Sequence, residues 1–316
     1  MTESPATSRS VSVIIAAHTF QRCDSLVQSV ASALDQSPQP REVIVVVDNN
    51  PELYEWVRSR LPDVVPVDHR GPRGASATRN TGARAAQGRF LAFLDDDAVA
   101  RPGWLENLIA PLTRPEVVGV GGYVEPVWLG PIPRWMPEEF LWVVGASYRG
   151  MPQTAAPIRN VWSENMAVAR ADFMKIGGFR EGFGKTGLEP RGGEDTDFCI
   201  RLSTTTDGGL WWYEPTAKIG HSVPPGRSTL RFFVMRCYNE GQTKADMARF
   251  VGSEKGLQDE RRHVVKTLPE GIGRELRRAM THQELFAAQR ASAIGVGLCA
   301  ASIGYAIRRT RRWITV

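Results

Sequence analysis

The sequence contains few cysteines, and none of them is placed for a metal site or a disulfide framework. Cys23, Cys199, Cys237 and Cys299 are the only four in 316 residues. No two of them have the C-x-x-C spacing of a zinc site, and their wide separation is unlike that of a small disulfide-stabilised domain. We therefore expect a reducing location that faces the cytoplasm.

The N-terminus lacks a long apolar run. Residues 1–10 are mostly polar, whereas a secretory signal needs an apolar core of roughly 7–15 residues. The sequence thus predicts neither a signal peptide nor secretion.

Motifs of nucleic-acid-binding proteins are also missing, although the net charge is +5. Residues 227–316 contain 17 Lys and Arg against 8 Asp and Glu, an excess of +9, which leaves −4 for residues 1–226. A basic patch can serve nucleic acid, anionic lipid or a phosphorylated substrate. Because zinc-finger spacing, an RNA-recognition aromatic motif and a helix-turn-helix pattern are all absent from the sequence, we expect no nucleic-acid partner.

An apolar, strand-like run over residues 90–94 ends in Asp95, Asp96 and Asp97. Clustering like charges at the end of a buried run is unfavourable unless a cation lies there. Mg2+ and Mn2+ prefer oxygen ligands, and commonly bind through one or two carboxylates together with substrate phosphates. The triplet predicts a binding site for a metal-bound phosphate compound. A solvated turn after the strand is the alternative.

Strand-like and helix-like segments alternate in the first third of the chain. This βαβαβ pattern predicts an α/β fold with a parallel sheet, whose ligands bind at the carboxyl ends of the strands. Asp48 and the Asp95 triplet both lie at such ends, so we expect them to face one crevice. The segments are residues 11–17, 24–34, 42–48, 75–87 and 90–97.

A third acidic cluster, Glu194 and Asp195, stands at the start of a predicted helix, where the helix dipole favours negative charge. The same pair is also what a simple helix N-cap would produce. Before it, residues 126–157 are rich in Pro and Trp, which predicts a loop with short elements over the site.

Five of these features, in their order and spacing, resemble the family 2 glycosyltransferases over roughly residues 10–225. They are Asp48, residues 74–82, residues 95–97, residues 177–179 and the pair 194–195. The resemblance implies the GT-A fold, a Rossmann-like, mixed and mostly parallel sheet flanked by helices. It also implies a nucleotide-diphosphate sugar donor, Mn2+ or Mg2+ as cofactor, and inversion of the anomeric centre.

Further segments resemble actinobacterial proteins labelled glucosyl-dolichyl-phosphate glucuronosyltransferases, namely residues 142–145, 147–150, 221–225 and 236–241. This resemblance implies a UDP-sugar donor, with UDP-glucuronate as one candidate, and a lipid-linked saccharide as acceptor. Two positions depart from the common family pattern. Residues 16–20 replace the usual Pro-Thr-Tyr-Asn-Arg, and Asn49 follows Asp48 where a second acid is usual.

The resemblance also implies roles for single residues. Asp195 would be the general base, with Glu194 orienting the acceptor. Asp97 would bind the metal, joined by Asp95 and by His221, for which a surface position is the alternative. The nucleotide would contact Ala16, His18, Asp48, Arg79, Asn80, Asp95 and Asp96, and the acceptor or sugar would contact Trp162, Glu164, Asn165, Arg191 and Gly193. Arg79 and Asn80 would otherwise brace the site, and Trp162 would otherwise belong to the core.

We expect three parts: a GT-A catalytic domain over residues 1–225, a basic helical acceptor or membrane-proximal region over 226–285, and an apolar helix with a basic tail over 286–316. Residues 291–307 carry no charge for 17 residues, close to the lower limit of about 17 for a membrane span. A peripheral or in-plane anchor, a true span and a small-residue packing helix are the competing interpretations. The arginines that follow favour the cytoplasmic face of the plasma membrane.

Three other functions compete with this interpretation. An enzyme that joins a sugar directly to polyprenyl phosphate needs no general base, so the Glu194–Asp195 pair argues against it. A non-catalytic sugar- or nucleotide-binding protein would keep the fold and lose the acids. A nucleotidyltransferase would need an N-terminal glycine-rich loop, and residues 11–20 contain no glycine.

Overall fold

The computed structural model describes residues 10–181, 185–186, 189–190, 192–251, 258–282 and 284–310. The chain divides into two compact units. The first unit comprises residues 1–125 and 152–221, and the second unit comprises residues 126–151 and 222–316.

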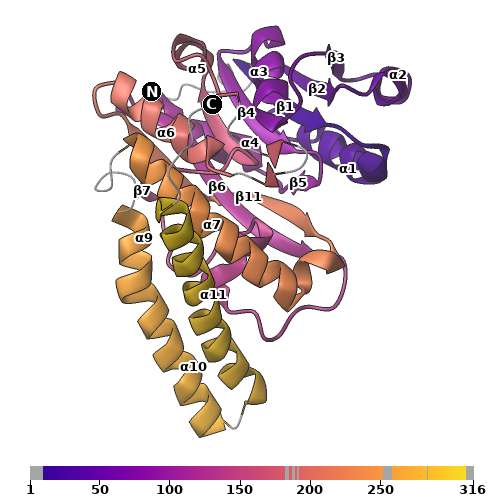
Figure 1. Ribbon diagram of the computed structural model, residues 1–316. Coiled ribbons are helices and arrows are strands. Elements are labelled where there is room, and N and C mark those ends of the chain that lie inside the picture. Colours follow the sequence, from indigo (N-terminus) through magenta and orange to yellow (C-terminus); the bar gives the residue numbers. More distant parts are fainter. Residues whose placement is uncertain are drawn as a thin grey trace. The chain divides into compact units, whose positions relative to one another are not determined.

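A nine-stranded mixed sheet has the strand order β3-β2-β1-β4-β8-β6-β11-β5, with β7 paired to β11 (Figure 1). Strands β3, β2, β1 and β4 run parallel, whereas β8 is antiparallel to β4 and to β6. The strands are β1 Val11–Ala17, β2 Glu42–Asp48, β3 Val65–His69, β4 Phe90–Asp95, β5 Ala98–Ala100, β6 Val117–Trp128, β7 Ala156–Ile158, β8 Asn165–Ala169 and β11 Leu210–Val223. The predicted βαβαβ alternation is confirmed. A separate pair joins β9 Lys185–Thr186 to β10 Glu189–Pro190.

Helices cover both faces of this sheet. Alternate residues of a strand point to opposite faces, so each strand contributes buried side chains to both layers. Val13 of β1 packs with residues of α1, α2 and α4 on one face, and Ile14 packs with residues of α3, α5 and α6 on the other. The helices of the first unit are α1 Cys23–Leu34, α2 Pro51–Arg60, α3 Ala75–Ala85, α4 Trp104–Ile109, α5 Arg170–Lys175 and α6 Glu194–Thr205, with short turns η2 Phe20–Arg22 and η3 Ala110–Thr113. Each large aliphatic side chain buried there stabilises the fold by roughly 1.5–3 kcal/mol.

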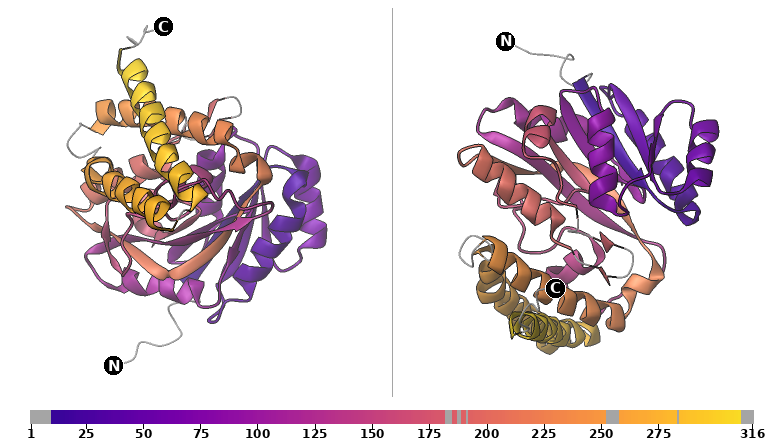
Figure 2. Two further views of the ribbon diagram at one scale, coloured as in Figure 1. Left: turned by 90° about the horizontal axis from the view of Figure 1, so that it is seen from below. Right: turned by 45° about the horizontal axis from the view of Figure 1, so that its top comes forward.

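The second unit is built on three helices, with α7 and α10 both lying against α11 (Figure 2). Its elements are η4 Glu138–Val144, η5 Pro225–Ser228, α7 Leu230–Val251, α9 Gln258–Arg262, the π-helical η6 His263–Thr267, α10 Leu268–His282 and α11 Leu285–Thr310. A Cβ on Gly241 would lie 1.9 Å from the Ala301 carbonyl oxygen, and one on Gly304 would lie 2.0 Å from that of Tyr238. Small residues therefore let the backbones of α7 and α11 touch.

Residues 126–151 group with the C-terminal helices in the second compact unit. The physical reason is packing, because Phe140 and Val143 of η4 are buried in one cluster with Phe233 of α7 and Ile294 of α11. The same cluster joins parts of the expected regions 226–285 and 286–316. Composition along the chain shows no trace of these contacts. The expected division into functional parts over residues 1–225, 226–285 and 286–316 stays a prediction.

Among the described helices, α11 is the one long and apolar enough to cross a membrane by length and composition, and a third of its most apolar window (33%) is buried within the protein. Its C-terminal end is tied to α7, since Arg308 Nε donates to Asp246 Oδ1 at 2.8 Å. The in-plane anchor, the true span and the packing helix all stay predictions for α11.

Candidate functional site

Three parallel strands end side by side at the edge of the sheet where the acidic residues were expected. Ala16 of β1 lies opposite Asp95 of β4, and Val47 of β2 lies opposite Ala17. Directly after the Asp triplet, β5 pairs with β11 so that Ala98 is opposite His221. The fold therefore gathers the first two acidic clusters and the late histidine at one edge.

Two guanidinium groups oppose the three carboxylates of the triplet. Arg22 Nη1 contacts Asp96 Oδ1 at 2.7 Å and Asp97 Oδ2 at 3.1 Å. Arg79 Nη2 donates to Asp95 Oδ1 at 2.5 Å. Asp96 is only 3% exposed, and burial raises its pKa to about 6 although Arg22 opposes this shift. One more positive charge is needed to balance the cluster.

The geometry around Asp97 fits a divalent cation. His221 Nε2 lies 3.5 Å from Asp97 Oδ1, which is long for a hydrogen bond. Two neighbouring ligands of one octahedral ion, each at 2.0–2.1 Å, are separated by about 3 Å. Asp96 Oδ2 is buried and has no hydrogen-bond partner among the described residues. Within the described ranges, no group of three or more His, Cys, Asp or Glu side chains is placed to hold a metal ion. Substrate oxygens would therefore have to supply the remaining ligands beside Asp97 and His221.

Asp48 ties a loop to the end of β2. Its Oδ2 accepts from the Gly74 backbone N–H at 3.0 Å, and its Oδ1 accepts from Asn49 Nδ2 at 2.7 Å. Gly74 has a φ of +133°, which favours glycine, and it is the N-cap residue directly before α3. The neighbouring His18 is exposed, and its carbonyl accepts from Asn50 Nδ2 at 3.2 Å. Asp48 and His18 thus stand at the rim of the same edge.

Asn80 braces the Gly-Gly-Phe turn. It donates to the Phe179 carbonyl at 2.8 Å and accepts from the Phe179 N–H at 2.9 Å. Gly178 has a φ of +69°, and a Cβ there would lie 2.4 Å from Asn80 Oδ1. The buried Asn80 side chain is occupied by these bonds, so its contacts match the bracing alternative.

A second clamp fixes the start of α6 to the same turn. Arg201 Nε donates to Asp197 Oδ2 at 2.8 Å, and its Nη2 donates to the Gly178 carbonyl at 2.7 Å. Asp197, a further acid of the third cluster, therefore serves the scaffold. The clamp sets the position of Glu194 and Asp195, which begin this helix.

Asp195 has the electrostatic surroundings of a base. Burial and the charge of Glu194 raise the pKa of Asp195 to about 7, while Arg79 and a hydrogen bond from Ser163 oppose the shift. A carboxylate near neutrality is suited to accept a proton at physiological pH. Asp195 Oδ1 and Glu194 Oε2 are buried atoms with no hydrogen-bond partner in the described part of the chain.

Arg79 links the triplet to this pair. Burial lowers the pKa of Arg79, but the charges of Asp95, Asp195 and Glu194 together raise it. The guanidinium is thus held charged among carboxylates from β4 and from α6. This arrangement brings the second and third acidic clusters into one site.

The expected acceptor residues are not all brought to that site. Asn165 is 1% exposed, accepts from Trp104 Nε1 at 2.8 Å and donates to the Ala217 carbonyl at 3.0 Å. It therefore joins elements of the core. Trp162 and Glu164 are half-buried. Gly193, with a φ of +107°, is the N-cap residue directly before α6. Arg191 lies outside the described residues.

Sequence reasoning missed Arg22 and Ser163. Arg22 ends the short turn η2 after β1, and no spacing rule connects it with Asp96. The available signal was a single arginine close to a strand end in a fold that gathers strand ends. Ser163 stands directly before Glu164 and carries no pattern of its own.

The fold of this chain is similar to that of two solved glycosyl-transfer proteins. The mannosyltransferase PcManGT from Pyrobaculum calidifontis, in complex with GDP-Man and Mn2+, matches 95% of this chain and 86% of its own at a TM-score of 0.58 and 18% identity. GalNAc-T7 with UDP, GalNAc and Mn2+ matches 79% of this chain and 54% of its own at a TM-score of 0.53 and 17% identity. The predicted GT-A fold is confirmed.

Comparison of sequences bears on the family. The glucosyl-dolichyl phosphate glucuronosyltransferase of Haloferax volcanii is 32% identical over 241 residues, which are 75% of this chain and 77% of the relative. Residues 12–177 match the model of glycosyl transferase family 2. The chain therefore belongs to glycosyl transferase family 2 and is a glycosyltransferase.

Proposed function

We propose that the protein is a metal-dependent, inverting glycosyltransferase. It transfers a sugar from a nucleotide-diphosphate donor, most simply a UDP-sugar, to a hydroxyl group of a lipid-linked saccharide. The observation that carries this proposal is the single site formed by Asp97 with His221 on one side and Asp95, Arg79 and Asp195 on the other.

The donor side of the site handles the leaving group. Mn2+ or Mg2+, held by Asp97 and His221 with Asp95 nearby, would offset the negative charge that develops on the nucleotide diphosphate. Arg22 forms ion pairs with both Asp96 and Asp97. Because guanidinium groups also bind phosphate well, Arg22 is available to contact the diphosphate when the donor is bound.

The acceptor side of the site removes a proton. As the acceptor oxygen attacks the anomeric carbon, the carbon–oxygen bond to the diphosphate breaks and Asp195 takes the hydroxyl proton. The raised pKa of Asp195 keeps it a usable base near neutrality. Glu194 precedes it on the same helix turn and orients the acceptor.

Asp48 and the Haloferax volcanii relative support a choice of donor base and sugar. Asp48 at the rim would accept a hydrogen bond from a uracil ring, with Ala16 and His18 beside it at the end of β1. The name of the Haloferax volcanii relative supports glucuronate as the sugar and a dolichyl-phosphate-linked glucose as the acceptor. Such an acceptor supports a position at the cytoplasmic face of the plasma membrane.

A second candidate reaction transfers the sugar directly to polyprenyl phosphate. The surroundings of Asp195 and Glu194 favour the hydroxyl acceptor, because an acceptor that is already ionised needs no base. The test offers labelled donor to polyprenyl phosphate and, separately, to its glucosyl derivative. The proposal expects labelled product from the glucosylated lipid alone, and product from unglucosylated polyprenyl phosphate would contradict it.

A further inference from the structure

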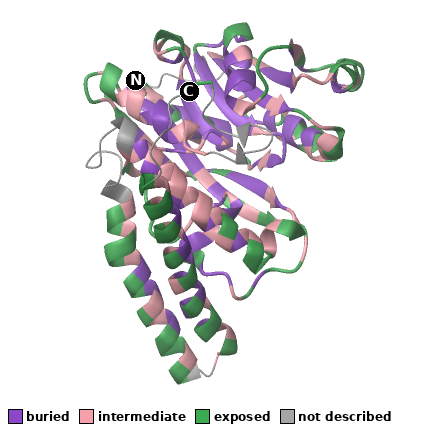
Figure 3. Cartoon of the chain, viewed as in Figure 1, coloured by how far each residue is buried: buried purple, intermediate pink, exposed green. Residues whose placement is uncertain are grey.

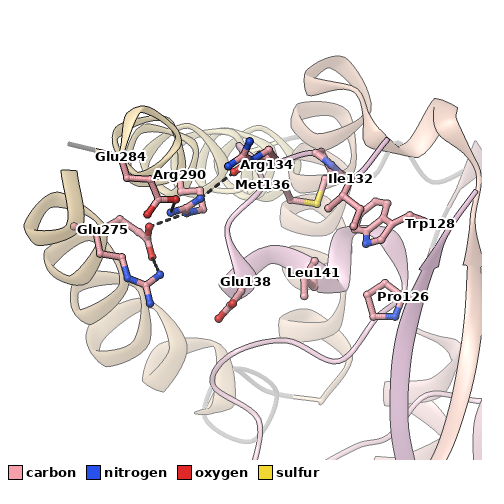
Figure 4. Close-up of a pocket in the computed structure, with 12 residues that line it drawn as sticks. Pro126, Trp128, Ile132, Arg134, Met136, Glu138, Leu141, Glu275, Glu284 and Arg290 are labelled. Carbon is pink, nitrogen blue, oxygen red and sulfur yellow. Dashed lines mark hydrogen bonds and ion pairs between the residues drawn. The ribbon is translucent and has the colours of Figure 1, made fainter. Parts of the chain in front are cut away.

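One face of α10 is fixed inside the second unit by buried ion pairs. Glu275 is 1% exposed, and its oxygens accept from Arg274 at 3.0 Å and from Arg290 of α11 at 2.7 Å. Arg274 also contacts the fully buried Glu139 of η4 at 2.8 Å. Glu275 and Arg290 line a cavity of about 350 Å³, and Figure 4 shows their side chains pointing toward each other. The inward face of α10 is therefore engaged, and its orientation is fixed.

The opposite face of α10, continued by the preceding η6, carries exposed apolar side chains at helical spacing. Val265 is 76%, Leu276 is 47% and Met280 is 77% exposed, and Pro269 lies between them. Positions 265, 269, 276 and 280 follow one another at steps of four, seven and four residues, which places them in one row. We call Val265, Leu276 and Met280 the outer row. Figure 3 shows exposed residues along this helix.

The charges beside the outer row are almost all positive. Between residues 260 and 281, the exposed basic residues are Arg261, Arg262, Lys266, Arg277 and Arg278, whereas Glu270 is the one exposed acid. Lys266 and Arg277 directly follow members of the outer row. An apolar row flanked by Lys and Arg is the pattern of a helix that lies in the plane of an anionic lipid surface.

The outward side of α11 differs from this pattern. It exposes Val296 and Ile303 but carries no charged residue between positions 291 and 307. Its other side packs on α7 through Gly304, and Arg308 pairs with Asp246. A helix held in this way supports α10 and gains nothing from anionic headgroups over most of its length.

We propose that the outer row and its flanking Arg and Lys residues form a docking surface for an anionic lipid bilayer, with α10 lying in the membrane plane. The apolar side chains enter the boundary of the acyl chains, and the basic side chains contact headgroup phosphates. This deepens the proposed function, on which it rests for its meaning, because a lipid-linked acceptor must be met at a bilayer.

The test is sedimentation of the full-length chain with vesicles, without donor or acceptor. Vesicles of phosphatidylcholine alone are compared with vesicles containing about a third phosphatidylserine. The wild type should bind the anionic vesicles and should be released as salt increases, because screening weakens the basic contacts. The double variant Leu276→Glu/Met280→Glu should lower the partition coefficient roughly tenfold or more.

Two control variants each place a single glutamate on another exposed apolar position, and each of the single variants Leu276→Glu and Met280→Glu is compared with them at equal charge. Val296→Glu on α11 and Met174→Glu in the first unit, which are 44% and 41% exposed, should bind vesicles as the wild type does. Thermal unfolding checks that each variant is folded. Donor hydrolysis by the double variant should stay at the wild-type rate, which separates a failed docking surface from a failed catalytic proposal.

Two results would overturn the docking surface. One is loss of vesicle binding in Val296→Glu while Leu276→Glu/Met280→Glu still binds, since α11 would then be the contact. The other is a folded wild type that ignores anionic vesicles at low salt or binds both vesicle types equally well.

Discussion

Single residues at the site are governed by the balance between carboxylates and guanidinium groups. Arg22 and Arg79 together contact all three members of the triplet, and Arg79 also faces Asp195 and Glu194. A divalent ion would add the missing positive charge beside Asp97. The same electrostatics that favour the metal also adjust the proton affinity of Asp195.

The pH dependence of transfer follows from Asp195. The base works in its deprotonated form, and its pKa is raised to about 7 by burial and by Glu194. We therefore expect kcat/KM to fall as the pH drops below about 7, where an ordinary aspartate would still be ionised. Asp195→Asn should abolish this acidic limb and slow transfer by roughly 10²- to 10⁴-fold, measured as initial rates from pH 5 to 9.

Ser163→Ala is the companion variant. The Ser163 hydrogen bond lowers the pKa of Asp195, so its removal should move the acidic limb to higher pH. Asp195 would not be the base if the acidic limb of the pH profile stayed in place in Ser163→Ala. The same conclusion would follow if that limb persisted in Asp195→Asn.

Among the elements, the Gly177–Gly178 turn holds α3 and α6 together through Asn80 and Arg201. Gly178→Ala should lower the free energy of unfolding by about 1–3 kcal/mol more than Gly177→Ala does. Both glycines have positive φ, +78° and +69°, but a Cβ would meet Asn80 only at Gly178, since nothing lies within 4 Å at Gly177. Urea denaturation of the two variants measures the difference. Equal destabilisation would show that the contact with Asn80 is unimportant.

Elements that carry a long run or a clear periodic pattern of apolar residues could be predicted from the sequence. Elements with only one or two buried residues could not. Strands β1, β2 and β4 carry runs of β-branched and other apolar residues that are buried on both faces, so their place in the sheet could be predicted. Helix α2 buries only Leu53 and Val57, which is too few to establish a helical period. The side-chain amides of Asn80 and Asn165 bond to the backbones of Phe179 and Ala217, which are far away in the sequence, so these bonds could not be predicted from it.

For the whole molecule, the sequence predicted the fold class and the basic C-terminal part, but not the grouping of residues 126–151 with it. That grouping depends on contacts between segments about a hundred residues apart, such as Phe140 with Phe233. Likewise, an uncharged run in α11 suggested the membrane contact, whereas burial and charge together point to α10. The solvent exposure of the side chains on α10 and α11 cannot be read from the sequence, and it is this exposure that distinguishes the two helices.

The central claim is that a divalent metal at Asp97 enables cleavage of a nucleotide-sugar donor. The measurement is hydrolysis of a panel of UDP- and GDP-sugars by the purified protein with and without Mn2+, comparing wild type with Asp97→Ala and with Asp63→Ala. Asp63 is an exposed aspartate of the first unit. We expect Mn2+-dependent turnover of one donor, lost in Asp97→Ala and retained in Asp63→Ala. Turnover that is unchanged in Asp97→Ala, or the absence of metal-dependent turnover and binding for every donor, would contradict the account.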